Sequence, residues 1–115
     1  HDPYPLQAGS LDLEIDLGAE MAIAAERGTE KIAVEIKSFL GASQISEFYS
    51  ALGQFITYRA ALVKQEPERQ LYLAVPKHIY DRFFIMLFIQ ELTEQNQVPL
   101  LIYNIEQEKI VQWKN

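Results

Sequence analysis

Residues 31–39 read KIAVEIKSF, a stretch rich in isoleucine and valine that also carries Glu35 and Lys37. Successive strand side chains point to opposite faces of a sheet, so a strand here would place its isoleucines and valine on one face. Glu35 and Lys37 would share the other face, about 7 Å apart along the strand. Two interpretations are open at this point: an ordinary solvated strand face, or the working edge of a functional site.

The composition predicts one globular domain over residues 1–115. Hydrophobic residues make up 49% of the chain and charged residues 23%, which is typical of folded proteins and argues against disorder. There is no cysteine, which excludes a disulfide framework and a thiolate zinc site. The absence of cysteine fits a reducing cytoplasm, where we expect the protein. No apolar run approaches the roughly 20 residues that cross a bilayer, so we expect no contact with membranes.

The charge is acidic and unevenly distributed along the chain. The net charge is −6 and the pI is about 4.8, whereas binding to nucleic-acid phosphates normally draws on a basic surface. Eight of the sixteen acidic residues fall within residues 1–35, where Arg27 and Lys31 are the only lysine or arginine. An acidic front half of this kind is either solvated or holds a divalent cation.

Hydrophobic periodicity and turn residues predict the order of elements. The predicted strands cover residues 11–17, 20–26, 31–39, 71–75, 99–103 and 109–113, and the predicted helices cover residues 43–65 and 79–95. Residues 1–10 are expected to form an extended entry, and Ser43 is expected to cap the first helix. The second helix is nearly apolar all round at its centre, which predicts burial. The order β-β-β-α-β-α-β-β indicates an α/β fold with a mixed sheet flanked by helices.

Asp16, Glu35 and Lys37 form the candidate site. Two carboxylates on neighbouring strands can bind Mg²⁺ or Mn²⁺ together, because these ions prefer oxygen ligands, and the backbone carbonyl of Ile36 would add a third. Lys37 would orient a metal-bound water, or lower its pKa, for attack on a phosphodiester. Glu20 is an alternative to Asp16 as the first ligand. An acid and a lysine two residues apart are also common on solvated strands that have no such function.

Gln54 and Tyr58 are four residues apart and therefore lie on one face of the first predicted helix, beside its apolar stripe. An amide and a hydroxyl in this position suit a bound phosphate or base. The alternative is that Tyr58 packs at the margin of the core and Gln54 is solvated. No histidine cluster and no glycine-rich phosphate loop is visible, which argues against a zinc hydrolase and a nucleotide-binding fingerprint.

Four blocks of the sequence, LDLEIDLGAE, EKIAVEIKSFLG, ALGQFITYRAAL and LYLAVP, resemble the XisH-like family of fdxN-element excision controlling factors. Proteins of this family look like members of the PD-(D/E)xK, restriction-endonuclease-like superfamily, whose core is a mixed sheet flanked by helices. The resemblance places the first acid at Asp16, the E-x-K element at Glu35 and Lys37, and a Gln-x-x-x-Tyr element similar to that of RecB-like nucleases at Gln54 and Tyr58. It also implies an N-terminal helix that is missing from this chain.

The resemblance implies an accessory role in the site-specific excision of a DNA element in cyanobacteria, alongside a recombinase and a companion excision control factor. One hypothesis is a metal-dependent DNA endonuclease, with Asp16, Glu35 and Lys37 catalytic and Gln54 and Tyr58 positioning the DNA. The other is a non-catalytic interaction module that recruits or regulates a recombinase or another partner. The full set of site residues favours the first hypothesis, and the acidic charge favours the second. Analogy with nucleases that cut both strands predicts a homodimer.

Overall fold

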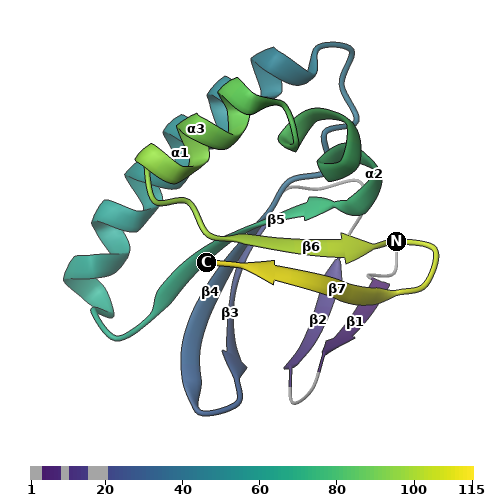
Figure 1. Ribbon diagram of the computed structural model, residues 1–115. Helices are drawn as coiled ribbons and strands as arrows, with labels where there is room; N and C mark the ends of the chain where they lie inside the picture. Colours follow the sequence, from purple (N-terminus) through teal and green to yellow (C-terminus); the bar gives the residue numbers. More distant parts are fainter. Residues whose placement is uncertain (1–3, 9–10, 16–20) are drawn as a thin grey trace.

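The structure is a computed structural model that describes residues 4–8, 11–15 and 21–115, with side chains described from Ala25 onward. It is a mixed α/β fold in which a curled sheet carries its helices on one side (Figure 1). The strands are β1 (Tyr4–Ala8), β2 (Leu11–Ile15), β3 (Met21–Arg27), β4 (Glu30–Ile36), β5 (Gln70–Pro76), β6 (Leu100–Asn104) and β7 (Lys109–Lys114). The helices are α1 (Gln44–Gln65), α2 (Lys77–Ile79), the π-helix η1 (Tyr80–Phe84) and α3 (Leu87–Gln95).

The strands form one sheet in the order β2-β1-β7-β6-β5-β4-β3. β4, β5 and β6 run parallel, because the chain crosses over the sheet through α1 and then through the α2–α3 segment. β3–β4 and β6–β7 are antiparallel hairpins, and the first turns through Gly28, whose φ of 62° suits glycine. β1 joins the sheet by pairing with β7 in parallel, with Gln7 opposite Lys109. The two edge strands, β2 and β3, contact each other, so the sheet is curled.

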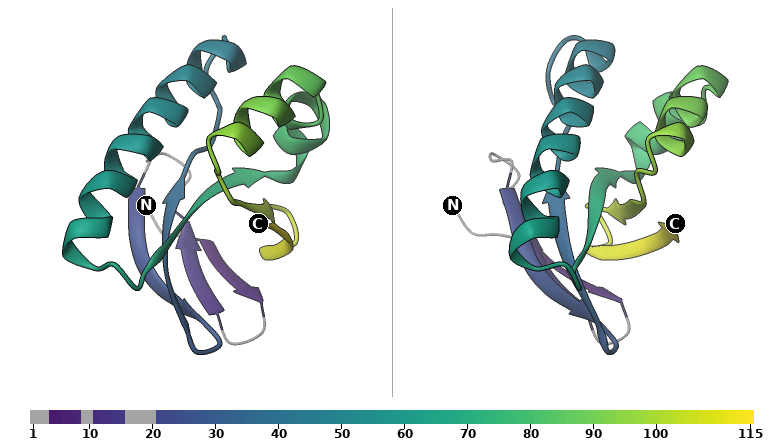
Figure 2. Two further views of the ribbon diagram at one scale, coloured as in Figure 1. Left: turned by 60° about the vertical axis from the view of Figure 1, so that its left-hand side comes forward. Right: turned by 90° about the vertical axis from the view of Figure 1, so that its left-hand side faces the viewer.

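Both faces of β4 are buried, and side-chain alternation divides them as the sequence predicts. Ile32, Val34 and Ile36 belong to the core on the face away from the helices. Ala33 belongs to the core beneath the helices, and Glu35 shares its face. Figure 2 shows α1 and the α2–α3 segment together on this side of the sheet. A solvated charged face on β4 is therefore excluded, because helices cover it.

The first predicted helix is confirmed as α1. Ser43 is its N-cap, since the side-chain hydroxyl accepts a hydrogen bond from the Ser46 N–H at 3.3 Å. The side chains that α1 buries are Phe48, Ala51, Phe55 and Leu62. These buried side chains fix the rotation of the helix over the sheet. Gln54 directly precedes one of them, Phe55, in the sequence.

The prediction of one buried helix over residues 79–95 is wrong. The helix is interrupted after η1, where Met86 adopts an extended conformation (ψ 135°) before α3 begins. The interruption leaves four consecutive apolar side chains exposed: Ile85 by 52%, Met86 by 51%, Leu87 by 72% and Phe88 by 60%. These four residues are called the 85–88 patch below. The flanking residues Phe83, Phe84 and Ile89 belong to the core.

The predicted order of elements also needs correction at the start of the chain. Residues 4–8 form strand β1, antiparallel to β2, within the segment expected to be an extended entry. Among the described residues, four strands therefore precede α1, and Pro5 lies within the first of them. Within the described ranges, no helix has both the length and the apolar composition needed to cross a membrane.

Candidate functional site

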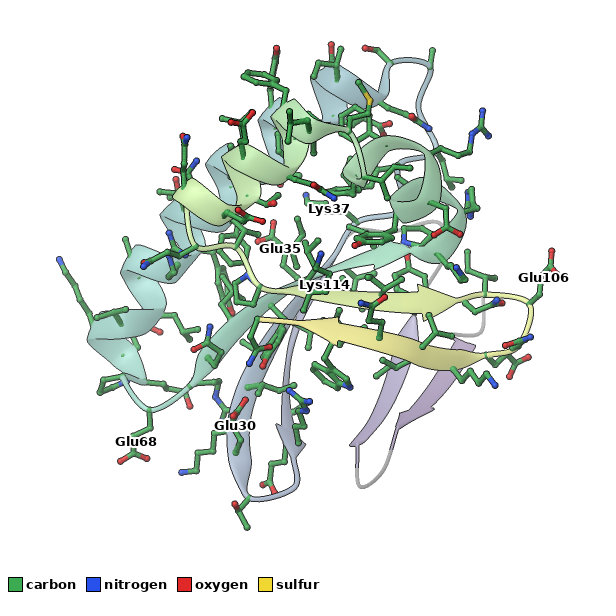
Figure 3. The ribbon with its side chains drawn as sticks, in the orientation of Figure 1. Glu30, Glu35, Lys37, Glu68, Glu106 and Lys114 are labelled. Carbon is green, nitrogen blue, oxygen red and sulfur yellow. The ribbon has the colours of Figure 1, made fainter. Side chains whose placement is uncertain are left out.

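Glu35 and Lys37 lie together between the sheet and the helices, at the end of β4 (Figure 3). The Nζ atom of Lys37 is 3.7 Å from Oε1 of Glu35, and each residue is only 6% exposed. Figure 3 places Glu30, Glu68 and Glu106 far from them, at the periphery. Burying charges is costly unless they are paired. The two charges are therefore buried as a pair, and they do not belong to a solvated strand face.

Gln54 joins the buried pair to the surface of α1. The Lys37 ammonium donates a hydrogen bond to the side-chain carbonyl oxygen of Gln54. Gln54 itself is an exposed residue, whereas its neighbour Phe55 is fully buried. The arrangement therefore has two buried charges and one solvent-facing amide. A ligand would reach the buried pair from the side of this Gln54 amide. The role of Gln54 in positioning DNA stays a prediction.

Tyr58 lies one helical turn beyond Gln54 and is 39% exposed. The two residues line a shallow depression along α1, together with Tyr49, Ser50, Gly53, Thr57 and Ala61. The structure thus places Tyr58 on the surface beside Gln54, outside the buried pair. A tyrosine exposed to this extent is accessible to a ligand, and its role in positioning DNA stays a prediction.

Asp16 is the first carboxylate of the predicted site, with Glu20 as its alternative. Asp16 and the alternative Glu20 lie outside the described residues, so their distance from Glu35 stays a prediction. Ile36 is the last residue of β4 and lies between Glu35 and Lys37 in the sequence. Its side chain is buried on the opposite face, and the role of its carbonyl is likewise a prediction.

The predicted metal ligands are two carboxylates and a carbonyl, all oxygen donors of the kind that Mg²⁺ prefers. Glu35 is the carboxylate of this set whose side chain the structure describes. Among the residues that the structure describes, which leave out Asp16, no three histidine, aspartate or glutamate side chains gather closely enough to hold an ion. The chemistry of the ligand set fits the ion, and its geometry depends on Asp16.

Tyr103 is a further residue that contacts the chain at the end of β4, and the sequence pattern does not predict its contact with Lys37. Its hydroxyl, on β6, donates a hydrogen bond to the backbone carbonyl of Lys37 at 3.3 Å. Tyr103 is fully buried, and burial raises the pKa of its hydroxyl above the ordinary tyrosine value, so the hydroxyl keeps its proton and can donate a hydrogen bond. The sequence places Tyr103 on a strand, but only the order of strands in the sheet shows that it reaches β4.

Comparison with known proteins identifies the family. A model of the XisH protein family matches residues 1–111. The chain belongs to the XisH family. It is 52% identical to an XisH family protein from Nostoc punctiforme whose crystal structure superposes with a TM-score of 0.79, covering 100% of this chain and 85% of that one. The fold and the candidate site described above are therefore those of an XisH-family chain.

A second crystal structure, of an fdxN element excision controlling factor protein from Anabaena variabilis, is also 52% identical to this XisH-family chain. It superposes with a TM-score of 0.78 and covers 100% of this chain and 84% of that one. A comparison with curated proteins finds no match. The resemblance predicted from the sequence blocks is confirmed.

Proposed function

We propose that this XisH-family chain acts in the excision of a DNA element and carries a metal-dependent, endonuclease-like site at the end of β4. The observation that supports the proposal is the buried Glu35–Lys37 pair, linked to the surface through Gln54. A mixed sheet with helices packed against it is compatible with a restriction-endonuclease-like fold of the PD-(D/E)xK class. The relative from Anabaena variabilis is named an fdxN element excision controlling factor.

Each residue of the site has a distinct role in this proposal. Asp16, Glu35 and the Ile36 carbonyl would hold Mg²⁺ or Mn²⁺, which supplies Lewis acidity and an activated water for phosphodiester hydrolysis. Lys37 stabilises the negative charge that develops on the phosphate, and Gln54 fixes the direction of its ammonium group. The exposed depression along α1, with Gln54 and Tyr58, is where the chain would contact the DNA backbone.

The partners proposed for this function are DNA, a recombinase and a companion excision control factor, acting in the cytoplasm. The net charge of −6 gives the chain little general attraction for DNA. The affinity of the chain for DNA would therefore depend on the bound metal ion and on the partner proteins. A homodimer is the proposed state if both strands are cut.

The test is a nicking assay on supercoiled and linear DNA with Mg²⁺ or Mn²⁺. Wild-type protein should nick DNA, and the double variant Glu35→Gln/Lys37→Met should not. The double variant removes both buried charges together, which favours a folded protein. Glu94→Gln, at an exposed position on α3, is the matched control and should retain activity. Absence of nicking by wild-type protein with either metal, or nicking that persists in the double variant, would overturn the proposal.

The second candidate function is a non-catalytic module that binds a recombinase, and the 85–88 patch favours it. Leu87 and Phe88 are 72% and 60% exposed in the first turn of α3. The same helix carries Glu91 and Glu94 on exposed positions and no basic residue. An apolar surface beside acidic side chains is complementary to a basic protein, and DNA-binding recombinases are basic. We therefore assign a recombinase as the occupant of this patch.

A binding titration with the purified recombinase of the excised element tests this second candidate. The Leu87→Glu/Phe88→Glu variant should lose binding, whereas Glu35→Gln/Lys37→Met should bind like wild type. Binding that is unchanged in the patch variant would exclude the patch as the recombinase site. Wild-type self-association that the patch variant abolishes would assign the patch to a homodimer instead.

A further inference from the structure

Pro76 interrupts the hydrogen-bond ladder beside Lys37. β4 and β5 pair in parallel, and the Lys37 N–H donates to the carbonyl of Ala74 at 3.0 Å. In a parallel ladder, the carbonyl of the same residue accepts from the N–H two positions further along the partner strand, which is position 76. Proline has no N–H, so position 76 cannot supply this bond.

The hydroxyl of Tyr103 takes the place of the missing N–H. Tyr103 lies directly beside Pro76 in the parallel pairing of β5 and β6. Its hydroxyl donates to the Lys37 carbonyl at 3.3 Å, while its ring belongs to the core on the face away from the helices. The Lys37 ammonium lies on the opposite, helix-covered face with Gln54. Tyr103 therefore bonds to the backbone of Lys37 from the face of the sheet opposite the helices.

The chain leaves the sheet immediately after Lys37. The end of β4 therefore needs other contacts to fix its position. β4 ends at Ile36, and Phe39 adopts a positive φ of 55°, a conformation that is costly for a residue with a side chain. Phe39 nevertheless packs edge to face on Phe84 of η1, with ring centroids 5.5 Å apart. Lys37 thus projects from a segment fixed on one side by this packing and on the other by Tyr103.

We propose that Tyr103 is a positioning residue of the site, replacing the ladder bond that Pro76 cannot make and fixing the end of β4 from which Lys37 projects. The functional part of this inference rests on the proposed function. The backbone contact between Tyr103 and Lys37 is independent of that function, and it can be tested without an activity assay. Pro76 has φ −66° and ψ 145°, which alanine also adopts, so Pro76→Ala restores the N–H without a change of backbone.

The first measurement is hydrogen exchange at the Lys37 amide, by NMR, in wild type, Tyr103→Phe, Pro76→Ala and the double variant. Tyr103→Phe should speed this exchange about tenfold, because the buried Lys37 carbonyl loses the hydrogen bond from the Tyr103 hydroxyl and the strand end opens. In the Pro76→Ala background, the same change should have an effect of about threefold or less. The Leu73 amide, which bonds to the Pro99 carbonyl at 2.9 Å, is the internal control and should not change.

The second measurement is the nicking rate of the same four proteins. Tyr103→Phe should lose about 10- to 100-fold, since a small displacement of a reacting group has effects of this size. Pro76→Ala alone should stay within about twofold of wild type, and the double variant should recover most of the loss. Recovery by a restored N–H is a result that general destabilisation would not produce.

The two proposals fail in different ways. No nicking by wild type would refute the endonuclease proposal and the functional role of Tyr103, while the exchange pattern would still decide the backbone contact. If wild type nicks DNA, two results would refute the positioning role alone. One is full activity of Tyr103→Phe, and the other is a loss of activity in Tyr103→Phe that Pro76→Ala does not rescue. Exchange at Lys37 that is the same in wild type and Tyr103→Phe would refute the contact itself.

Discussion

Replacing Lys37 with methionine removes the ammonium but leaves the Glu35 carboxylate in a buried position. Both residues are 6% exposed, and Nζ lies 3.7 Å from Oε1. Breaking one partner of a buried ion pair typically costs about 3–5 kcal/mol. For a chain of this size, about 1 kcal/mol shifts Tm by roughly 4 °C, so Lys37→Met should lower Tm by about 10–20 °C.

The double variant Glu35→Gln/Lys37→Met should be far more stable than the single variant. Replacing a whole buried pair with uncharged residues of similar size is often neutral, because the desolvation cost disappears with the attraction. Its Tm should therefore stay within about 5 °C of wild type. Thermal and urea denaturation of wild type, both single variants and the double variant give the coupling energy directly.

The exposed Lys77–Asp81 pair is a matched control for this experiment. Its Nζ–Oδ2 distance is only 2.7 Å, but the two side chains are 47% and 49% exposed. Lys77→Met should therefore cost less than about 0.5 kcal/mol despite the shorter contact. A Lys37→Met protein as stable as wild type would contradict the reasoning, and so would a double variant as unstable as the single one.

Three further changes test other parts of the structure. Phe55→Ala should lower the free energy of unfolding by about 3–5 kcal/mol in urea titrations, because this fully buried ring of α1 would leave a cavity. Ser43→Ala should cost about 1 kcal/mol, measured in the same way, because α1 loses its N-cap. The raised pKa of Tyr103 makes its contribution to stability complete below about pH 10, the unfolded value, and lost at higher pH. Between pH 9 and pH 11, Tm should thus fall more in wild type than in Tyr103→Phe; equal falls would contradict the assignment.

The parts of the fold that the sequence predicts are those governed by local rules. The alternation of Glu35 and Lys37 against Ile36 follows from strand geometry alone. The start of α1 follows from the capping chemistry of Ser43. The sequence blocks around these residues also led to the family, which the full-length matches confirm.

The parts that the sequence did not predict depend on packing between distant segments. Whether Glu35 and Lys37 are solvated depends on α1 folding back over β4, which periodicity cannot show. The interruption at Met86 occurs between two buried segments, ending at Phe84 and resuming at Ile89, although the apolar pattern is continuous through it. Tyr103 was missed for the same reason, since its contact with Lys37 requires β5 to lie between their strands.

The pairing of β1 with β7 has a consequence for synthesis on the ribosome. The β1–β2 hairpin is made before the other described strands, yet it joins the sheet through Lys109 on β7. Chains emerge at about 5–20 residues per second, so the hairpin waits for roughly 5–20 seconds before its partner strand exists. During that interval β3, β4 and β5 can assemble with α1, because all four elements end by Pro76, and the hairpin docks later. A nascent chain arrested before residue 109 should therefore already contain the Glu35–Lys37–Gln54 cluster.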